Sequence, residues 1–229
     1  MPVDLHPYEE NLLRLEEQGR RRFLSPAYGI DFSSNDYLGL KHHPRMTAAL
    51  TRALDAGMEC GSGGSRLLRG NHPAHEELEH QAAHWFGAEA ALFMATGYLA
   101  NLAVMSTLPQ RQDAIVFDEW MHASGKEGIR ASLARSSKAR HNDPASFEDE
   151  VLRWRRQGRR NIWIYVESVY SMDGDFAPLA ALMEIADRHD AFLVVDEAHA
   201  TGLFGDQGRG LVWPASLDRQ GVQINIVAG

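Results

Sequence analysis

Asp196 and His199 are the residues whose types and spacing most clearly suggest chemistry. The apolar run 191–195 before them predicts a buried strand, because it is short and bounded by polar residues and glycine. Asp196 then lies where a parallel strand ends, which is where open α/β sheets hold their ligands. A carboxylate there, followed closely by an imidazole, suggests a group aimed at a ring nitrogen of a ligand. The same pair is also typical of a plain strand end, so both interpretations stay open here.

The four residues Asp-Glu-Ala-His at 196–199 also spell the acidic motif of a helicase family. Such ATPases need a phosphate-binding loop of the form Gly-x-x-x-x-Gly-Lys-Ser/Thr. The one Gly-Lys pair in the chain is Gly125-Lys126, and Glu127 follows it. The sequence therefore argues against a nucleotide-driven ATPase.

Candidate phosphate-binding groups lie earlier in the chain. Gly97 and Tyr98 follow Thr96 between a predicted strand and a predicted helix. Glycine there lets an anion approach backbone N–H groups at the positive end of the helix dipole. The alternative interpretation is that the aromatic side chain of Tyr98 belongs to the hydrophobic core. The glycine-rich loop 61–70 is either an anion-binding nest or a mobile loop.

Three further polar residues follow predicted strands. His122 comes just after strand 114–117 and is suited to stack on a planar ligand or to move protons, although a surface histidine is a serious alternative in a chain with eleven. Glu167 ends strand 161–167, and Ser171 lies shortly after it. None of the three identifies a site by itself.

Strands and helices alternate along the chain, which predicts an α/β fold with a mostly parallel sheet and helices on both faces. The clearest βαβ unit combines strand 161–167, a helix with apolar spacing over 179–189 and strand 191–195. The other predicted helices cover 6–24, 44–58, 73–86, 96–108, 124–132 and 146–157, and the other predicted strands cover 30–33, 90–94, 114–117 and 223–229.

Composition limits the class of protein. A net charge of −8 argues against a nucleic-acid surface, although residues 153–160 carry a local basic run. Cys60 is the one cysteine, which rules out an internal disulfide and fits a reducing cytosol. The N-terminus lacks an apolar signal core, and polar residues interrupt the most apolar window, 88–105. We therefore expect a cytoplasmic protein that binds neither membrane nor nucleic acid.

Taken in this order, these segments resemble the α-oxoamine synthases, pyridoxal-phosphate enzymes that condense an acyl-CoA with an amino acid. The resemblance implies the large domain of a fold-type-I, aspartate-aminotransferase-like transferase. Segment 63–73 is most similar to the biotin-pathway member, which joins pimeloyl-CoA or pimeloyl-carrier protein to L-alanine with decarboxylation. Relatives that use glycine or serine stay an alternative. The matching segments are 35–39, 61–65, 96–98, 122–124, 171–174, 196–199 and 205–210.

Carried over residue by residue, the resemblance implies a site for pyridoxal 5'-phosphate. Gly97 and Tyr98 would hold the cofactor phosphate through backbone N–H groups, and His122 would stack on the pyridine ring. Asp196 would pair with the pyridine nitrogen and keep it protonated, because an adjacent carboxylate favours the cation. A protonated ring is the electron sink of this chemistry.

The resemblance assigns the remaining site residues as well. Ser171 and His199 would hydrogen-bond the ring hydroxyl, and Glu167 is a candidate for proton handling or substrate positioning. One of the arginines 20–22 would contact the acyl substrate, and Arg20 is favoured for this role. Asn35 and His122 are further expected substrate contacts. No residue is assigned to a metal. The expected catalytic residues are His122, Glu167, Asp196 and His199.

The resemblance also predicts an organisation and a departure from the family. Residues 1–45 would form an N-terminal helix and arm, and residues 46–229 an incomplete cofactor-binding large domain without the C-terminal small domain. The family's cofactor lysine would lie just beyond 223–229, and no lysine of the chain is in a matching context; these are Lys41, Lys126 and Lys138. We therefore expect an inert fragment of an active homodimer, with a lysine-less, non-catalytic partner subunit as the alternative.

Overall fold

The computed structural model of the chain describes residues 3–26, 28–212 and 223–227. By its internal contacts the chain divides into two units, Met1–Met58 and Glu59–Gly229. Within the described ranges, no helix is both long enough and apolar enough to cross a membrane.

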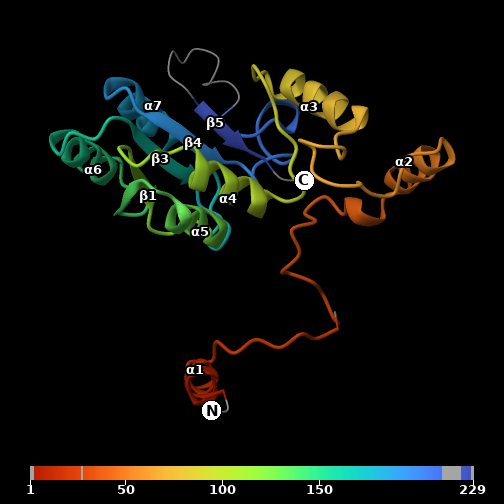
Figure 1. Cartoon of the computed structure of the whole chain (residues 1–229), viewed down its shortest axis with the longest axis horizontal. Helices are drawn as coiled ribbons and strands as arrows, with labels where there is room; N and C mark the ends of the chain where they lie inside the picture. Colours follow the sequence, from red (N-terminus) through yellow and green to blue (C-terminus); the bar gives the residue numbers. More distant parts are fainter. Residues whose placement is uncertain (1–2, 27, 213–222, 228–229) are drawn as a thin grey trace. The chain divides into compact units, whose positions relative to one another are not determined.

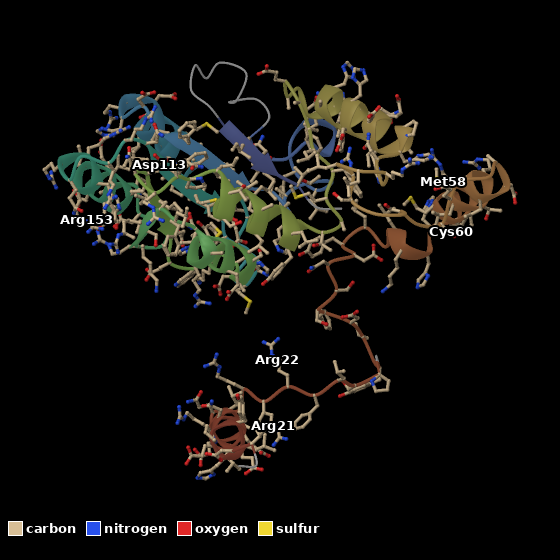
Figure 2. The ribbon with its side chains drawn as sticks, in the orientation of Figure 1. Arg21, Arg22, Met58, Cys60, Asp113 and Arg153 are labelled. Atoms are coloured by element: carbon tan, nitrogen blue, oxygen red, sulfur yellow. The ribbon has the colours of Figure 1, made fainter. Side chains whose placement is uncertain are left out.

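The described part of the first unit contains α1 (His6–Glu17), the 3-10 turn η1 (Leu40–His42) and α2 (Pro44–Asp55). The predicted helix 6–24 is wrong beyond Glu17. Gly19 adopts a left-handed φ of 64° just past the end of α1, a conformation that terminates helices. Arg21 and Arg22 consequently lie in non-helical chain (Figure 2).

The predicted strand 30–33 is also wrong. The carboxylate of Asp31 accepts hydrogen bonds from the backbone N–H groups of Ser33, at 2.9 Å, and Ser34, at 3.1 Å. These local bonds curl the backbone into a bend and use N–H groups that a strand would offer to a neighbour.

The second unit is built on a parallel sheet, in which the described residues form five strands in the order β2-β1-β3-β4-β5. Figure 1 labels β1, β3, β4 and β5 among them. Strands β1 and β3 are buried along their whole length, as is typical of a parallel sheet covered on both faces. The fold class predicted from the sequence is confirmed. The strands are β1 (Ala114–Asp118), β2 (Arg135–Ala139), β3 (Ile162–Glu167), β4 (Phe192–Asp196) and β5 (Gln223–Ile226), and the other elements are α3 (Pro73–Phe86), α4 (Gly97–Thr107), α5 (Ala123–Ala131), α6 (Pro144–Arg156), α7 (Leu179–Arg188) and η2 (Asp206–Gly208).

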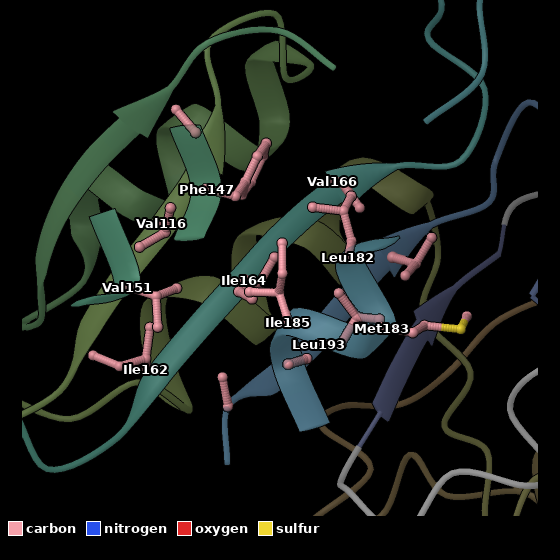
Figure 3. Close-up of a cluster of buried hydrophobic side chains, with 14 of the residues drawn as sticks. Val116, Phe147, Val151, Ile162, Ile164, Val166, Leu182, Met183, Ile185 and Leu193 are labelled. Carbon is pink, nitrogen blue, oxygen red and sulfur yellow. The ribbon is translucent and has the colours of Figure 1, made fainter. Parts of the chain in front are cut away.

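One face of the sheet is covered by α6 and α7 (Figure 3). Phe147 of α6 and Leu182 of α7 pack in one buried cluster with Val116, Ile164 and Leu193 of the central strands. Each such side chain contributes about 1.5–3 kcal/mol when it is fully buried. This layer therefore stabilises the packing of α6 and α7 on the sheet.

The opposite face is covered by α4 and α5. Met105 and Ile129 of these helices share a buried cluster with Ile115 and Tyr165, which alternate along the strands with the residues facing α6 and α7. The helices thus lie on both faces of the sheet.

Two glycines allow α5 to approach its neighbours closely. A Cβ on Gly125 would lie 2.6 Å from Cε1 of Tyr165, and a Cβ on Gly128 would lie 2.9 Å from the backbone oxygen of Asn101. Real Cβ atoms do not tolerate such distances, so only glycine permits this packing. The packing brings the start of α5 beside both β3 and α4.

Two segments of the second unit differ from the sequence prediction. Residues 90–94 are not a strand, because the backbone N–H of Phe93 donates to the carboxylate of Glu79 at 2.7 Å rather than to a sheet neighbour. Strand β2 was not predicted, since Arg135–Ala139 is polar and exposed, a composition typical of an edge strand.

Replacing Gly125 by alanine should destabilise the protein by about 1–3 kcal/mol, the usual cost of overpacking. In an exposed helix, alanine is more stabilising than glycine. Here, however, the added methyl group would meet the fully buried ring of Tyr165. Urea unfolding of the purified protein measures the change. Gly63→Ala is the control, because a Cβ there meets nothing within 4 Å; an equal loss in both variants would contradict the packing argument.

Candidate active site

Three acidic residues end three neighbouring strands of the sheet. Asp118, Glu167 and Asp196 are the last residues of β1, β3 and β4, and they are 0%, 1% and 5% exposed. Since the strands are parallel, their carboxyl ends share one edge, and Glu167 and Asp196 are paired across the β3–β4 ladder. Asp196 thus lies at the strand end that the sequence predicted, on the edge where α/β sheets hold ligands.

Neutral donors hold the carboxylate of Asp196. Its Oδ1 accepts from the backbone N–H of Ala198 at 2.9 Å, and its Oδ2 accepts from Nδ2 of Asn101 at 2.7 Å. Its own carbonyl accepts from the backbone N–H of Ser168 at 2.8 Å, which anchors the strand end to β3. A buried carboxylate held in this way is oriented but not neutralised by these donors, so it is suited to pair with a cationic group of a ligand.

Glu167 is fixed by two backbone N–H groups, those of His122 at 2.6 Å and Ser171 at 3.4 Å. Burial, followed by the neighbouring charge of Asp196, raises the pKa of Glu167 to about 7, although both hydrogen bonds oppose the rise. The structure therefore brings these three predicted residues together. It also gives Glu167 a proton affinity suited to proton transfer near neutral pH.

Two histidines stand at the same edge. The ring of His122 caps α5, since its Nδ1 accepts from the backbone N–H of Ser124 at 3.2 Å. Burial lowers the pKa of His199, the charge of Asp196 opposes this, and His122 adds to the lowering. His199 is therefore neutral at pH 7 and is suited to hydrogen bonding rather than to carrying charge.

The N-terminus of α4 lies beside the end of β4. Thr96 caps the helix by accepting a backbone N–H of the first turn at 3.1 Å. Gly97 and Tyr98 are the first helical residues, whose N–H groups lack intrahelical acceptors and favour an anion. Asn101, one turn later, contacts Asp196. The predicted phosphate-binding segment and the predicted ring-binding carboxylate are thus neighbours.

The glycine-rich loop 61–70 is tied to α3 by a forked ion pair. The guanidinium of Arg66 contacts the two carboxylate oxygens of Glu79 at 2.5 and 3.0 Å. The hydrogen bonds from Arg66 lower the pKa of Glu79 to about 2, despite the partial burial of this carboxylate. Within the loop, a Cβ on Gly70 would lie 1.8 Å from the backbone oxygen of Gly64, so a tight turn requires glycine there.

Two predicted substrate-binding residues belong to the first unit. Arg20 lies just past α1, with its guanidinium 3.5 Å from the side chain of Gln18. Asn35 accepts a hydrogen bond from the hydroxyl of Tyr37 at 3.4 Å. Their roles at the site stay predictions.

Comparison with known proteins identifies the family. The aminotransferase class I and II family matches residues 28–227. The chain belongs to this family. It is 42% identical over 233 residues to 8-amino-7-oxononanoate synthase from Emericella nidulans, covering 94% of this chain and 57% of that protein. The enzyme of the same name from Chromobacterium violaceum is 46% identical over 181 residues, which cover 79% of this chain and 46% of the relative. The chain spans about half the length of the curated relatives it matches.

Solved structures of family members share the fold. Serine palmitoyltransferase from S. paucimobilis with a bound PLP–myriocin aldimine matches with a TM-score of 0.76 at 27% identity, covering 96% of this chain and 59% of that one. The 8-amino-7-oxononanoate synthase from Francisella tularensis matches with a TM-score of 0.66 at 28% identity, covering 85% and 51%. The resemblance to the α-oxoamine synthases is confirmed.

This family member has polar groups beside the site that sequence reasoning missed. Asn101 lies in the apolar helix α4, is 3% exposed, and accepts a hydrogen bond from the hydroxyl of Tyr165. An amide within an apolar helical run and a phenol within a buried strand were the available signals, because buried polar groups need partners.

A second missed group is His141, which bridges Asp118 at 2.8 Å and Asp175 at 2.7 Å and stacks on Trp120. Partial burial works to lower the pKa of His141, but the hydrogen bonds with the two carboxylates outweigh it and raise that pKa. His141 and the two carboxylates thus connect the ends of β1 and β2 to the loop that carries Ser171.

Replacing Glu167 by glutamine should remove a pH dependence of stability. An unfolded glutamate ionises near pH 4.5, whereas folded Glu167 keeps its proton to about pH 7. Its contribution is therefore fully present below pH 4.5 and is lost as the pH rises through 7, by about 3 kcal/mol. Urea unfolding of the cofactor-free protein across this pH range measures the loss.

The exposed Glu184 of α7 supplies the matched control, since Glu184→Gln should keep the pH dependence of the parent protein. A Glu167→Gln variant that loses as much stability between pH 4.5 and 8 as the parent would contradict the raised pKa of Glu167.

Proposed function

We propose that the full-length protein is a pyridoxal-phosphate-dependent acyltransferase of biotin biosynthesis. It would condense pimeloyl-CoA, or pimeloyl-carrier protein, with L-alanine and release carbon dioxide to form 8-amino-7-oxononanoate. The observation that carries the proposal is Asp196, a buried carboxylate held by neutral donors beside the anion-binding end of α4. The identity of 42% to 8-amino-7-oxononanoate synthase over 94% of the chain supports this choice of reaction.

The residues at the sheet edge fit pyridoxal phosphate. Asp196 would pair with the pyridine nitrogen, and Gly97 and Tyr98 would bind the phosphate through their own backbone N–H groups, which have no intrahelical acceptor at the start of α4. His122 would stack on the ring, and Ser171 would contact the ring hydroxyl. When bound, the protonated pyridine ring supplies an electron sink for the carbanion formed at the substrate Cα.

Two residues would handle protons and orient groups around the ring. His199, kept neutral by burial, would hydrogen-bond the ring hydroxyl without adding charge. Glu167 would hold the backbone of His122 through its 2.6 Å hydrogen bond and exchange a proton near pH 7. In the complete homodimer, Arg20 and Asn35 would contact the substrates.

The proposal is tested by assaying the full-length protein with pyridoxal phosphate, L-alanine and pimeloyl-CoA. Release of CoA and carbon dioxide, with formation of the amino-oxo acid detected by mass spectrometry, is the expected result. Serine and glycine are assayed in parallel with pimeloyl-CoA and palmitoyl-CoA. Faster turnover with serine or glycine would show that this amino acid, and not alanine, is the substrate. Absence of turnover with every pair would refute the proposed reaction.

Asp196→Ala should lower kcat by about 100-fold or more, the effect expected when a preorganised electrostatic partner of the reacting group is removed. Steady-state kinetics of the full-length variant measure the loss. Glu184→Ala, an exposed change on α7, is the control for general effects of removing a carboxylate. Turnover of Asp196→Ala at the parent rate would contradict the pairing of Asp196 with the ring nitrogen.

A further inference from the structure

Asn101 connects the residue expected at the ring nitrogen of the cofactor with the residue expected on the ring face. Its Nδ2 lies 2.7 Å from Oδ2 of Asp196 and 3.0 Å from Oγ of Ser124. Oγ of Ser124 in turn lies 2.7 Å from Nδ1 of His122. Asn101 is 3% exposed and Ser124 is fully buried, so these partners replace water. A continuous chain of hydrogen bonds thus runs from Asp196 to His122.

The amide of Asn101 has one orientation that satisfies its surroundings. The carboxylate of Asp196 accepts hydrogen bonds, so the amide nitrogen must face it. Burial, then the charges of Asp196 and Glu167, raise the pKa of Tyr165 well above its usual value, so its hydroxyl stays a donor to Oδ1 of Asn101. Both hydrogens of the amide are therefore used, one by Asp196 and one by Ser124.

The orientation of Asn101 fixes the direction of the next bond. Since Oγ of Ser124 accepts from Asn101, its single hydroxyl hydrogen is free to donate to Nδ1 of His122. The backbone N–H of Ser124 donates to the same nitrogen at 3.2 Å. Nδ1 of His122 thus faces two donors and must be unprotonated, which leaves the proton of the neutral ring on Nε2.

We propose that Asn101 and Ser124 are positioning residues that hold His122 as the Nε2–H tautomer and tie its ring to the carboxylate of Asp196. We call this pair the Asn101–Ser124 relay. The glycine packing of α5 supports the relay, because Gly128 lets this helix approach Asn101 closely. The ring expected to lie on the cofactor thereby presents a hydrogen-bond donor at Nε2. Only the connection to the cofactor rests on the proposed function, since the hydrogen bonds are within the chain.

The test measures which nitrogen of His122 carries the proton in the full-length protein, with and without pyridoxal phosphate. Solid-state NMR of protein labelled with ring ¹⁵N histidine separates protonated from unprotonated nitrogens, and subtraction of the His122→Gln spectrum assigns His122. At neutral pH the expected result is an unprotonated Nδ1 and a protonated Nε2. A protonated Nδ1 in the parent protein would overturn the proposal, whether or not any variant folds.

Asn101→Asp keeps the shape of the side chain but removes the amide donor to Ser124. The hydroxyl of Ser124 is then free to turn away from His122, so the signal of Nδ1 should shift toward the protonated position. Asn161→Asp is the matched control, because the amide of Asn161 also donates to a carboxylate, at 2.9 Å, but to Asp113. A shift in the control equal to that in Asn101→Asp would overturn the relay.

Ser124→Ala provides an independent variant, because it removes the hydroxyl donor and leaves the backbone N–H in place. Both neutral tautomers of His122 should then be populated. An unchanged Nδ1 signal in both Ser124→Ala and Asn101→Asp would overturn the proposal.

The dissociation constant of pyridoxal phosphate should rise about tenfold in Asn101→Ala, because the carboxylate of Asp196 is then no longer held in the orientation expected to meet the pyridine nitrogen. An unchanged constant would overturn the tie between Asn101 and Asp196. Failure of the parent protein to bind pyridoxal phosphate would refute the proposed function, while the tautomer measurement would still decide the relay. The two failures are therefore distinguishable.

Discussion

The structure depends on the accommodation of buried acids at the carboxyl edge of a parallel sheet. Burying a charge costs several kcal/mol unless donors or an opposite charge replace the lost water. Three strands end in such acids, and each acid is accommodated differently. Asp118 bonds to His141, Glu167 keeps its proton to about pH 7, and Asp196 is held by neutral donors. Of the three, Asp196 is the carboxylate that these contacts orient without a counter-charge, which suits it to a cationic ring.

The helices α4 and α5 on one face of the sheet contribute polar groups to its carboxyl edge as well as apolar side chains to the core. Helix α4 contributes an N-terminus at Gly97, where backbone N–H groups favour an anion, and, one turn later, the amide of Asn101. Helix α5 begins at the cap formed by His122 and approaches β3 because Gly125 has no side chain. The close approach of α5 to β3 and α4 is therefore needed for the polar contacts at this edge as well as for the packing of the core. A larger residue in α5 would move the groups that orient Asp196 as well as opening the core.

The sequence predicted the parts of the fold that rest on strong periodicity. The strands ending in Glu167 and Asp196 are continuous apolar runs up to these acids, and the helix between them has regular apolar spacing, so their positions follow from local pattern. The bend at 30–33 and the irregular segment 90–94 were wrongly predicted as strands. Asp31 accepts hydrogen bonds from N–H groups within its own bend, and Glu79 of α3 accepts one from the N–H of Phe93; no apolar periodicity reveals such hydrogen bonds. Asn101 was missed for the same reason, since its partners are distant in sequence.

The position of the predicted cofactor-binding residues at the carboxyl edge of the sheet also explains why the fold alone does not identify the substrates of the reaction. Serine palmitoyltransferase from S. paucimobilis matches this chain with a TM-score of 0.76 at 27% identity, although its name implies serine and a palmitoyl group rather than the alanine and pimeloyl group proposed for this chain. Groups that bind and tune a ring cofactor serve any condensation of this class, so they are expected to be common to enzymes with different substrates. Discrimination must therefore come from residues that contact the amino acid and the acyl chain. Arg20 and Asn35 are predicted to be of this kind, and both belong to the unit Met1–Met58 rather than to the unit that contains Asp196.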